Sequence, residues 1–285
     1  MGLWADIIEK ISSPLAFFPP TPSTYRVDTA TTKDGARRCT MVGPSVRDEK
    51  LLRHCTCRVL KTKRRRGGGG GEDIVSLFVP YPGAKKTILY SHGNAVDLGI
   101  MHHFHLHMSR VLQVNVMGYD YSGYGASSGR PTVRNTLADI RAVWECLLDE
   151  CGIDPRDVIL YGQSVGSGPT AELASKLDSH LGGVVLHSPL VSGMRVLAPQ
   201  LRRWPSWLDI YPNHRFVPAI QTKVLVLHGT EDEVIDVAHG KLLHSLCKHP
   251  GQPLWAEGFD HQNLESHPHF TETLATFLND VDADR

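Results

Sequence analysis

The 285-residue chain lacks the features of an exported or membrane-spanning protein. Its N-terminal stretch, MGLWADIIEKISSPLAFFPP, has no basic segment followed by an uninterrupted apolar one. No run elsewhere approaches the roughly 18 apolar residues of a membrane-spanning helix. The six cysteines are scattered without the spacing of a metal site. We therefore expect reduced thiols and a cytoplasmic protein.

The chain also lacks an excess of charge of either sign. Its 30 Lys and Arg residues balance 30 Asp and Glu residues, so the formal net charge is zero. Nucleic-acid-binding domains carry clustered positive charge, and we therefore expect no nucleic-acid partner. Hydrophobic residues make up 41% of the sequence, which is enough for one large globular domain with its own core. We expect this domain to be a monomer.

Short apolar runs alternate with helix-length segments from residue 86 onward. The runs predicted to be strands are TILYSH, VNVMGYDY, VILYGQ, GGVVLHS, KVLVLHG and PLWAEGF. Helices are predicted over roughly 99–110, 132–150, 166–178, 236–248 and 266–280. This alternation predicts an α/β protein with a mostly parallel sheet that is covered by helices on both faces.

Other segments complete the predicted organisation. Residues 1–40 are predicted to form a lead segment and residues 41–285 one α/β domain. Its first strands, LLRHCTCRVL and IVSLFVPY, form a hairpin with a flexible basic and polyglycine tip over 61–73. The segment 189–221 is too long for a simple crossover, and we interpret it as a cap over the carboxyl edge of the sheet.

The pattern Gly-x-Ser-x-Gly occurs twice, around Ser164 and around Ser127. A nucleophilic serine of this type needs a sharp turn between a buried strand and a helix. Ser164 meets this condition, because VILYGQ precedes it and a helical segment follows it. Ser127 comes well after its strand, and Arg130-Pro131 interposes a turn before the next helix. We therefore predict that Ser164 is the nucleophile.

A serine hydroxyl needs a base to take its proton and an acid to orient that base. Asp232 directly follows the strand KVLVLHG, whereas Asp236 is placed to cap the next helix. His261 directly follows the last strand, whereas His267 and His269 lie at the entry to the final helix. We favour Asp232 as the acid and His261 as the base, with the other three residues as alternatives.

The oxyanion that forms in acyl transfer needs two backbone N–H donors. We predict that one is the N–H of Val165, directly after the nucleophile, and that the other is the N–H of Asn94 in the loop SHGNAVDLG. The simpler alternative for this loop is a plain turn in which His92 is a satisfied core residue.

Several long strings resemble those of the alpha/beta-hydrolase domain-containing 17 family, which are palmitoyl-protein thioesterases. The strings are SHGNAVDLG, YDYSGYGASSGRP, YGQSVGSGPT, LHSPLVSGMRV and LHGTEDEVIDVAHG. The resemblance implies the alpha/beta-hydrolase fold and a triad of Ser164, Asp232 and His261. Animal members are anchored through an N-terminal cysteine cluster, whereas the first cysteine here is Cys39. The insertion KTKRRRGGGGG is also foreign to the family.

We therefore expect a serine hydrolase that cleaves acyl thioesters and removes palmitate from S-acylated proteins, without a metal or organic cofactor. The alternative is a carboxylesterase or monoacylglycerol lipase, because the same triad acts on oxygen esters. An aminopeptidase is disfavoured because the predicted cap has no evident acidic cluster to hold a substrate amine. A non-catalytic binding protein is disfavoured because every triad element is present.

Two features are candidates for peripheral contact with the cytoplasmic face of a membrane. One is an apolar helical face made of Trp4, Ile7, Ile8 and Ile11. The other is the basic tip made of Lys61, Lys63, Arg64, Arg65 and Arg66, for which a solvated loop is the alternative. Gly2 is a candidate for myristoylation, although Asp6 stands where Ser or Thr is expected. His103 and His107 have the spacing of some zinc sites but lack the accompanying glutamate, so we predict no metal.

Overall fold

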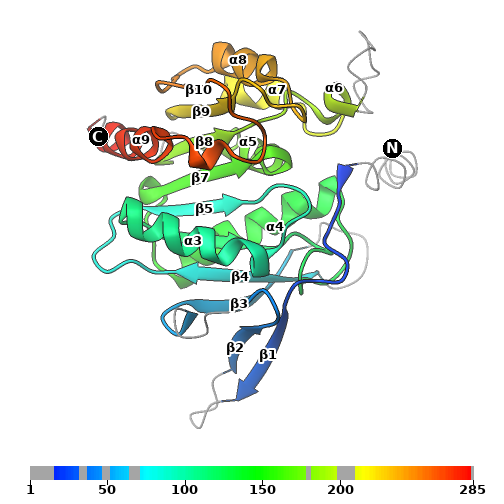
Figure 1. Cartoon of the computed structure of the whole chain (residues 1–285). Coiled ribbons are helices and arrows are strands. Elements are labelled where there is room, and N and C mark those ends of the chain that lie inside the picture. Colours follow the sequence, from blue (N-terminus) through cyan, green and yellow to red (C-terminus); the bar gives the residue numbers. More distant parts are fainter. Residues whose placement is uncertain are drawn as a thin grey trace. The chain divides into compact units, whose positions relative to one another are not determined.

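A computed structural model of the chain describes residues 16–31, 37–46, 52–63, 71–177, 181–197 and 209–283. The chain divides into two compact units, Phe17–Ile153 and Asp154–Arg285. Both units consist of β-strands with helices packed against them (Figure 1).

The strands of the Phe17–Ile153 unit are hydrogen-bonded in the order β1-β2-β3-β4-β6-β5. In that order they span Arg26–Thr31, Arg37–Val42, Thr56–Lys61, Asp73–Val79, Asn115–Tyr119 and Thr87–Ser91. The pairs from β1 to β6 are antiparallel, and β5 pairs with β6 in parallel. The predicted hairpin corresponds to β3 and β4. Neither β1 nor β2 was predicted from the sequence. In β1 five of six residues are exposed, so no alternation marks it as a strand.

Two capped helices accompany these strands. They are α3 and α4, which span Leu98–Leu112 and Val133–Glu145. Asp97 caps α3 by accepting a hydrogen bond from the Ile100 N–H, and Thr132 caps α4 through the Asn135 N–H. Helix α4 continues as the π-helical turn Cys146–Glu150. In Figure 1, α3 lies in front of β4 to β6 and α4 lies behind them, so helices cover both faces of these strands.

The Asp154–Arg285 unit contains the parallel strands β7-β8-β9-β10, hydrogen-bonded in chain order. They span Val158–Gln163, Gly183–His187, Val224–Gly229 and Leu254–Ala256. The helices α5 to α9 span Ser167–Ala174, Gly193–Leu197, Asn213–Phe216, Val237–Leu246 and Phe270–Ala283. Every residue of β8 and β9 is buried, as expected for parallel strands covered on both faces. The predicted fold class is therefore confirmed.

The described parts of the segment 189–221 contain α6, α7 and the 3₁₀ turn Val217–Ala219, and α7 packs against α5. Asn213 at the start of α7 donates a hydrogen bond to the Leu190 carbonyl oxygen at 2.9 Å. A side chain at Gly168 in α5 would collide with the ring of Tyr211, so glycine permits this close packing. Residues 198–208 of the predicted cap lie outside the described residues.

Candidate active site

Ser164 occupies a strained turn between β7 and α5. Its φ of +53° lies in the left-handed region that residues other than glycine rarely adopt. Strand β7 ends at Gln163, and the 3₁₀ turn Ser164–Gly166 leads directly into α5. A Cβ at Gly162 would lie 2.6 Å from the Gly166 carbonyl oxygen, so this position requires glycine. The structure therefore places Ser164 in the strand–turn–helix context that a nucleophile of this kind needs.

The strained backbone of Ser164 is held by a short hydrogen-bonded chain. The Ser167 hydroxyl donates to the Ser164 carbonyl oxygen at 2.6 Å. The Ser167 oxygen in turn accepts a hydrogen bond from the Asn213 side-chain amide at 3.2 Å. Because Asn213 belongs to α7, the described part of the cap supports the turn that carries Ser164.

The structure brings Ser164, Asp232 and His261 together, from the loops that follow β7, β9 and β10. His261 Nε2 lies 3.1 Å from Ser164 Oγ, and His261 Nδ1 lies 2.7 Å from Asp232 Oδ2. An ionised carboxylate only accepts hydrogen bonds, so Nδ1 carries the hydrogen. In the neutral ring Nε2 is then the acceptor, and it faces the serine hydroxyl. This arrangement can move a proton from Ser164 to His261.

Four donors surround the fully buried carboxylate of Asp232. Oδ1 accepts the N–H groups of Val234 at 3.0 Å and Ile235 at 2.7 Å. Oδ2 faces Nδ1 of His261 and also, at 3.3 Å, Nε2 of His228, which the sequence analysis did not single out. Burial by itself raises the pKa of Asp232, but the hydrogen bonds from His228, His261 and the Ile235 N–H outweigh burial and hold this pKa below its ordinary value.

The lowered pKa of Asp232 has a consequence for stability. Because the folded-state pKa is below the unfolded one, the ionised group stabilises the fold above the unfolded pKa of about 3.9. That contribution is lost as the pH falls through the lowered folded-state pKa. Asp232 therefore stays ionised in mild acid, and a loss of activity there must come from another group.

The alternative acid and bases have other partners. Asp236 is exposed and caps α8 by accepting the Ala238 N–H at 2.7 Å. His269 Nδ1 pairs with the carboxylate of Glu272 at 2.9 Å at the start of α9. His267 Nδ1 accepts the His269 N–H at 3.1 Å. These contacts stabilise helix ends.

Ser127, the serine of the second Gly-x-Ser-x-Gly pattern, has structural contacts in the Phe17–Ile153 unit. Its side chain is buried. The hydroxyl donates to the Asp120 carbonyl oxygen at 3.0 Å and accepts the Val75 N–H at 2.9 Å. It therefore ties the turn after β6 to β4.

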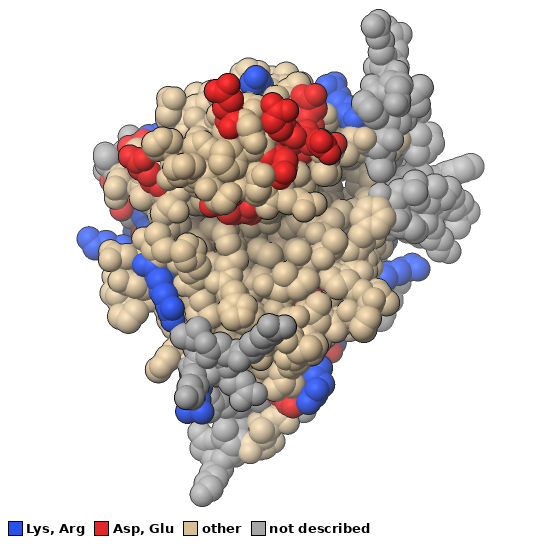
Figure 2. All heavy atoms as spheres, viewed as in Figure 1, with Lys and Arg blue, Asp and Glu red and all other residues tan. Residues whose placement is uncertain are grey.

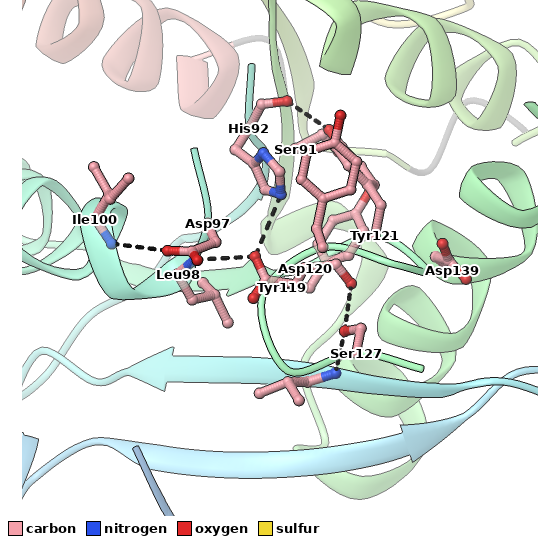
Figure 3. A network of polar contacts seen from close by, with 12 residues as sticks. Ser91, His92, Asp97, Leu98, Ile100, Tyr119, Asp120, Tyr121, Ser127 and Asp139 are labelled. Carbon is pink, nitrogen blue, oxygen red and sulfur yellow. Dashed lines mark hydrogen bonds and ion pairs between the residues drawn. The ribbon is translucent and has the colours of Figure 1, made fainter. Parts of the chain in front are cut away.

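A polar network that includes His92, Asp120 and Tyr121 holds the loop after β5 (Figure 3). Asn94 belongs to the same loop. The Tyr124 hydroxyl donates to Asn94 Oδ1 at 2.7 Å, and the Tyr121 hydroxyl donates to the His92 carbonyl oxygen at 2.6 Å. His92 Nε2 lies 3.5 Å from Asp120 Oδ1. Burial raises the pKa of Asp120, although the contact with His92 opposes it. The loop is thus fixed by contacts within the Phe17–Ile153 unit, and three of the residues involved, Asp120, Tyr121 and Tyr124, were not singled out from the sequence.

Val165, the other predicted oxyanion donor, directly follows Ser164 in the 3₁₀ turn. The first N–H groups of a helix have no partner within that helix. The Val165 N–H therefore has the position in the chain that an oxyanion donor needs.

Exposed acidic side chains gather around the loops that carry Asp232 and His261 (Figure 2). The exposed acids of the loops after β9 and β10 are Glu231, Glu233, Asp236 and Glu257. These side chains give the surface around the two loops an excess of negative charge.

His103 and His107, which have the spacing of some zinc sites, are both exposed on α3. Among the described residues, no group of three or more His, Cys, Asp or Glu side chains is arranged to hold a metal ion. Within the same part of the chain, none of the helices combines the length and the apolarity needed to span a membrane.

The predicted membrane contacts lie mostly outside the described residues. These are Gly2, Trp4, Ile7, Ile8 and Ile11 at the N-terminus and Arg64, Arg65 and Arg66 at the basic tip. The remaining basic residues are in ion pairs: Lys61 Nζ lies 2.8 Å from Asp73 Oδ1, and Lys63 Nζ lies 2.7 Å from Glu145 Oε2.

The fold and its similarity to known proteins define the protein as a hydrolase of the alpha/beta-hydrolase fold. Residues 82–216 match the family model described as serine aminopeptidase, S33. A Pyrococcus furiosus esterase, Pf2001, aligns with a TM-score of 0.64 over 82% of this chain and 95% of that protein. At 16% identity, this likeness shows the fold alone.

More specifically, the chain belongs to the alpha/beta hydrolase domain-containing protein 17 family. It is 41% identical to the human alpha/beta hydrolase domain-containing protein 17B over 278 residues, which cover 95% of this chain and 91% of the human protein. It is also 41% identical to the 17B protein of Xenopus laevis, over 94% of this chain and 91% of that protein. The family predicted from the sequence motifs is thus confirmed.

Proposed function

We propose that the chain is a serine hydrolase that cleaves acyl thioesters and removes palmitate from S-acylated proteins. The observation that carries this proposal is the connected arrangement of Asp232, His261 and Ser164, with Ser164 on a strained turn. Such strain is costly in an ordinary turn and is typical of functional sites.

In the proposed reaction, Ser164 Oγ attacks the carbonyl carbon of the thioester while His261 Nε2 takes its proton. Asp232 stabilises the imidazolium that forms. The backbone N–H groups of Val165 and Asn94 are the proposed oxyanion donors. When the tetrahedral intermediate collapses, the C–S bond breaks and the leaving sulfur receives the proton from His261. Water then attacks the acyl-enzyme by the same route and regenerates Ser164.

The triad also acts on oxygen esters, so the proposed preference rests on the family resemblance and on the leaving group. A cysteine thiol has an ordinary pKa of about 8.5, and its thiolate leaves with less help from an acid than an alkoxide does. Esterase or monoacylglycerol lipase activity remains the alternative. The aminopeptidase name of the matching family model adds a third reaction to test.

A matched substrate panel tests the proposed function. We expect kcat/KM for an S-palmitoyl peptide to exceed that for the same peptide with O-palmitoyl serine by about tenfold or more. An aminoacyl anilide should be hydrolysed more slowly than both. A preference for the oxygen ester would favour the esterase alternative, and a preference for the anilide would favour an aminopeptidase.

We also propose that the protein works in the cytoplasm at a membrane surface, where an S-palmitoylated substrate presents its thioester. The apolar face Trp4, Ile7, Ile8 and Ile11 would insert into the interface. The basic tip at residues 61–66 would contact anionic lipid. Because Lys61 and Lys63 are already paired with acidic side chains, most of the attraction would have to come from Arg64, Arg65 and Arg66.

A further inference from the structure

His228 stands beside the proposed triad, where it approaches the same carboxylate oxygen of Asp232 as His261 does. It lies near the end of β9, and its side chain is completely buried. Its Nε2 lies 2.7 Å from the Ile235 carbonyl oxygen and 3.3 Å from Asp232 Oδ2. A carbonyl oxygen can only accept, so Nε2 must carry a hydrogen. This N–H is shared between the carbonyl group and the carboxylate.

The other ring nitrogen explains why this tautomer is fixed. His228 Nδ1 is buried and has no hydrogen-bond partner among the described residues. A Cβ on Gly240 of α8 would lie only 2.5 Å from Nδ1, so the helix backbone packs closely against this edge of the ring. A hydrogen on Nδ1 would be buried without an acceptor, which costs free energy. The contacts of the ring therefore fit the tautomer that carries its hydrogen on Nε2.

We propose that His228 is a positioning residue that orients the carboxylate of Asp232 toward His261. This inference rests on the proposed function. Two backbone N–H groups hold Oδ1, and the two histidines hold Oδ2, so the carboxylate cannot rotate about its own axis without losing donors. His228 also binds the Ile235 carbonyl oxygen, and the Ile235 N–H binds Asp232. The ring thus fixes the acid and the loop that presents it.

Removal of this donor should change how His261 titrates. A carboxylate that has lost the His228 N–H interacts more strongly with the remaining donor, which favours the protonated form of His261. The titratable groups that interact with His261 are Asp232, His187 of β8 and Glu265 of the turn Leu264–Ser266. A change at His228 acts on His261 mainly through the donor that it removes from Asp232. When kcat/KM is plotted against pH, its fall on the acidic side, the acidic limb, should therefore move to higher pH.

Variants at His228 separate positioning from packing. His228→Gln places an amide N–H close to the original Nε2, whereas His228→Asn places one near Nδ1, and His228→Phe provides no donor. We expect His228→Phe to lower kcat about tenfold or more with KM nearly unchanged, and to shift the acidic limb upward. The His228→Gln variant should retain most of the wild-type kcat and the wild-type acidic limb. The His228→Asn variant should behave like His228→Phe.

The matched control is His244→Phe. His244 Nε2 also donates to a backbone carbonyl, that of Gly251 at 3.1 Å, but His244 has no contact with Asp232 among those described. The His244→Phe variant should be less stable than the wild type but should keep the acidic limb of the wild-type pH profile. All rates are expressed per active site, counted by the final extent of fluorophosphonate labelling, so that unfolded protein does not lower kcat. The proposal would be overturned if His228→Phe had the kcat and the acidic limb of the wild type. It would also be overturned if His228→Phe and His228→Gln lost the same amount of kcat and neither variant shifted the acidic limb.

A second readout is independent of turnover. Imidazole ¹⁵N spectra of the full chain, recorded at neutral pH, should show the His228 hydrogen on Nε2 and not on Nδ1. A His228 hydrogen on Nδ1 would contradict the inference even if the wild-type enzyme is active. Conversely, an inactive wild-type protein with the expected His228 spectrum would reject the proposed function and leave the tautomer assignment standing.

Discussion

Ser164→Ala should reduce hydrolysis of a p-nitrophenyl acyl ester and of an S-palmitoyl peptide by about 10⁴-fold or more. The variant lacks the hydroxyl that forms the acyl-enzyme, and neither Asp232 nor His261 can replace it. It should also fail to react with a fluorophosphonate. Its fold should persist, because alanine keeps the turn and the Ser164 carbonyl oxygen still accepts the Ser167 hydroxyl.

Ser127→Ala is the control for this experiment because Ser127 has the same sequence pattern. It removes a buried hydroxyl that accepts from Val75 and donates to Asp120. We expect a loss of about 1–3 kcal/mol in the free energy of unfolding, because two buried backbone groups lose their partner. Activity per labelled site should stay close to that of the wild type. Normal labelling of Ser164→Ala, or loss of labelling in Ser127→Ala, would show that the nucleophile is wrongly assigned.

Asp232→Asn should lower kcat by about 10⁴-fold, because the substitution removes the negative charge that orients and stabilises His261. The geometry of the site adds a second effect. Each carboxylate oxygen of Asp232 faces two donors, so whichever way the asparagine amide turns, its NH₂ group meets donors only. We therefore also expect a loss of stability of about 1–3 kcal/mol, measured by urea unfolding.

Asp236→Ala is the matched variant for Asp232→Asn. It removes the cap of α8 and should cost about 0.5–2 kcal/mol of stability, with kcat unchanged. Asparagine would be a poor choice here because it caps helices about as well as aspartate. If Asp236→Ala were inactive and Asp232→Asn active, the two acids would have to exchange roles.

The candidate site could be predicted because its residues lie at positions that strand order defines. Parallel strands place their carboxyl ends at one edge, so residues in the loops that follow β7, β9 and β10 are candidates for one site. That argument selects Ser164, Asp232 and His261 from the sequence alone, and the structure brings these side chains within hydrogen-bonding distance. Whether they act as a catalytic triad stays a prediction until it is measured.

Contacts that depend on tertiary packing could not be predicted in this way. His228 follows an apolar run and resembles any satisfied core histidine, because its role depends on α8 closing off Nδ1. Tyr124 is 30 residues from Asn94, and no local pattern links them. Strand β1 was not predicted because most of its side chains are exposed and show no alternation. In each case, packing between distant segments decides the outcome.

The most direct test of the central claim is to trap the acyl-enzyme. The protein would be mixed with an S-palmitoyl peptide, quenched in acid within the first turnover and analysed by peptide mapping and mass spectrometry. We predict palmitate on the peptide that contains Ser164, as an oxygen ester that resists neutral hydroxylamine, and its absence from Ser164→Ala. Palmitate on a cysteine or on another serine, or rapid turnover with no acyl group on Ser164, would contradict the proposed mechanism.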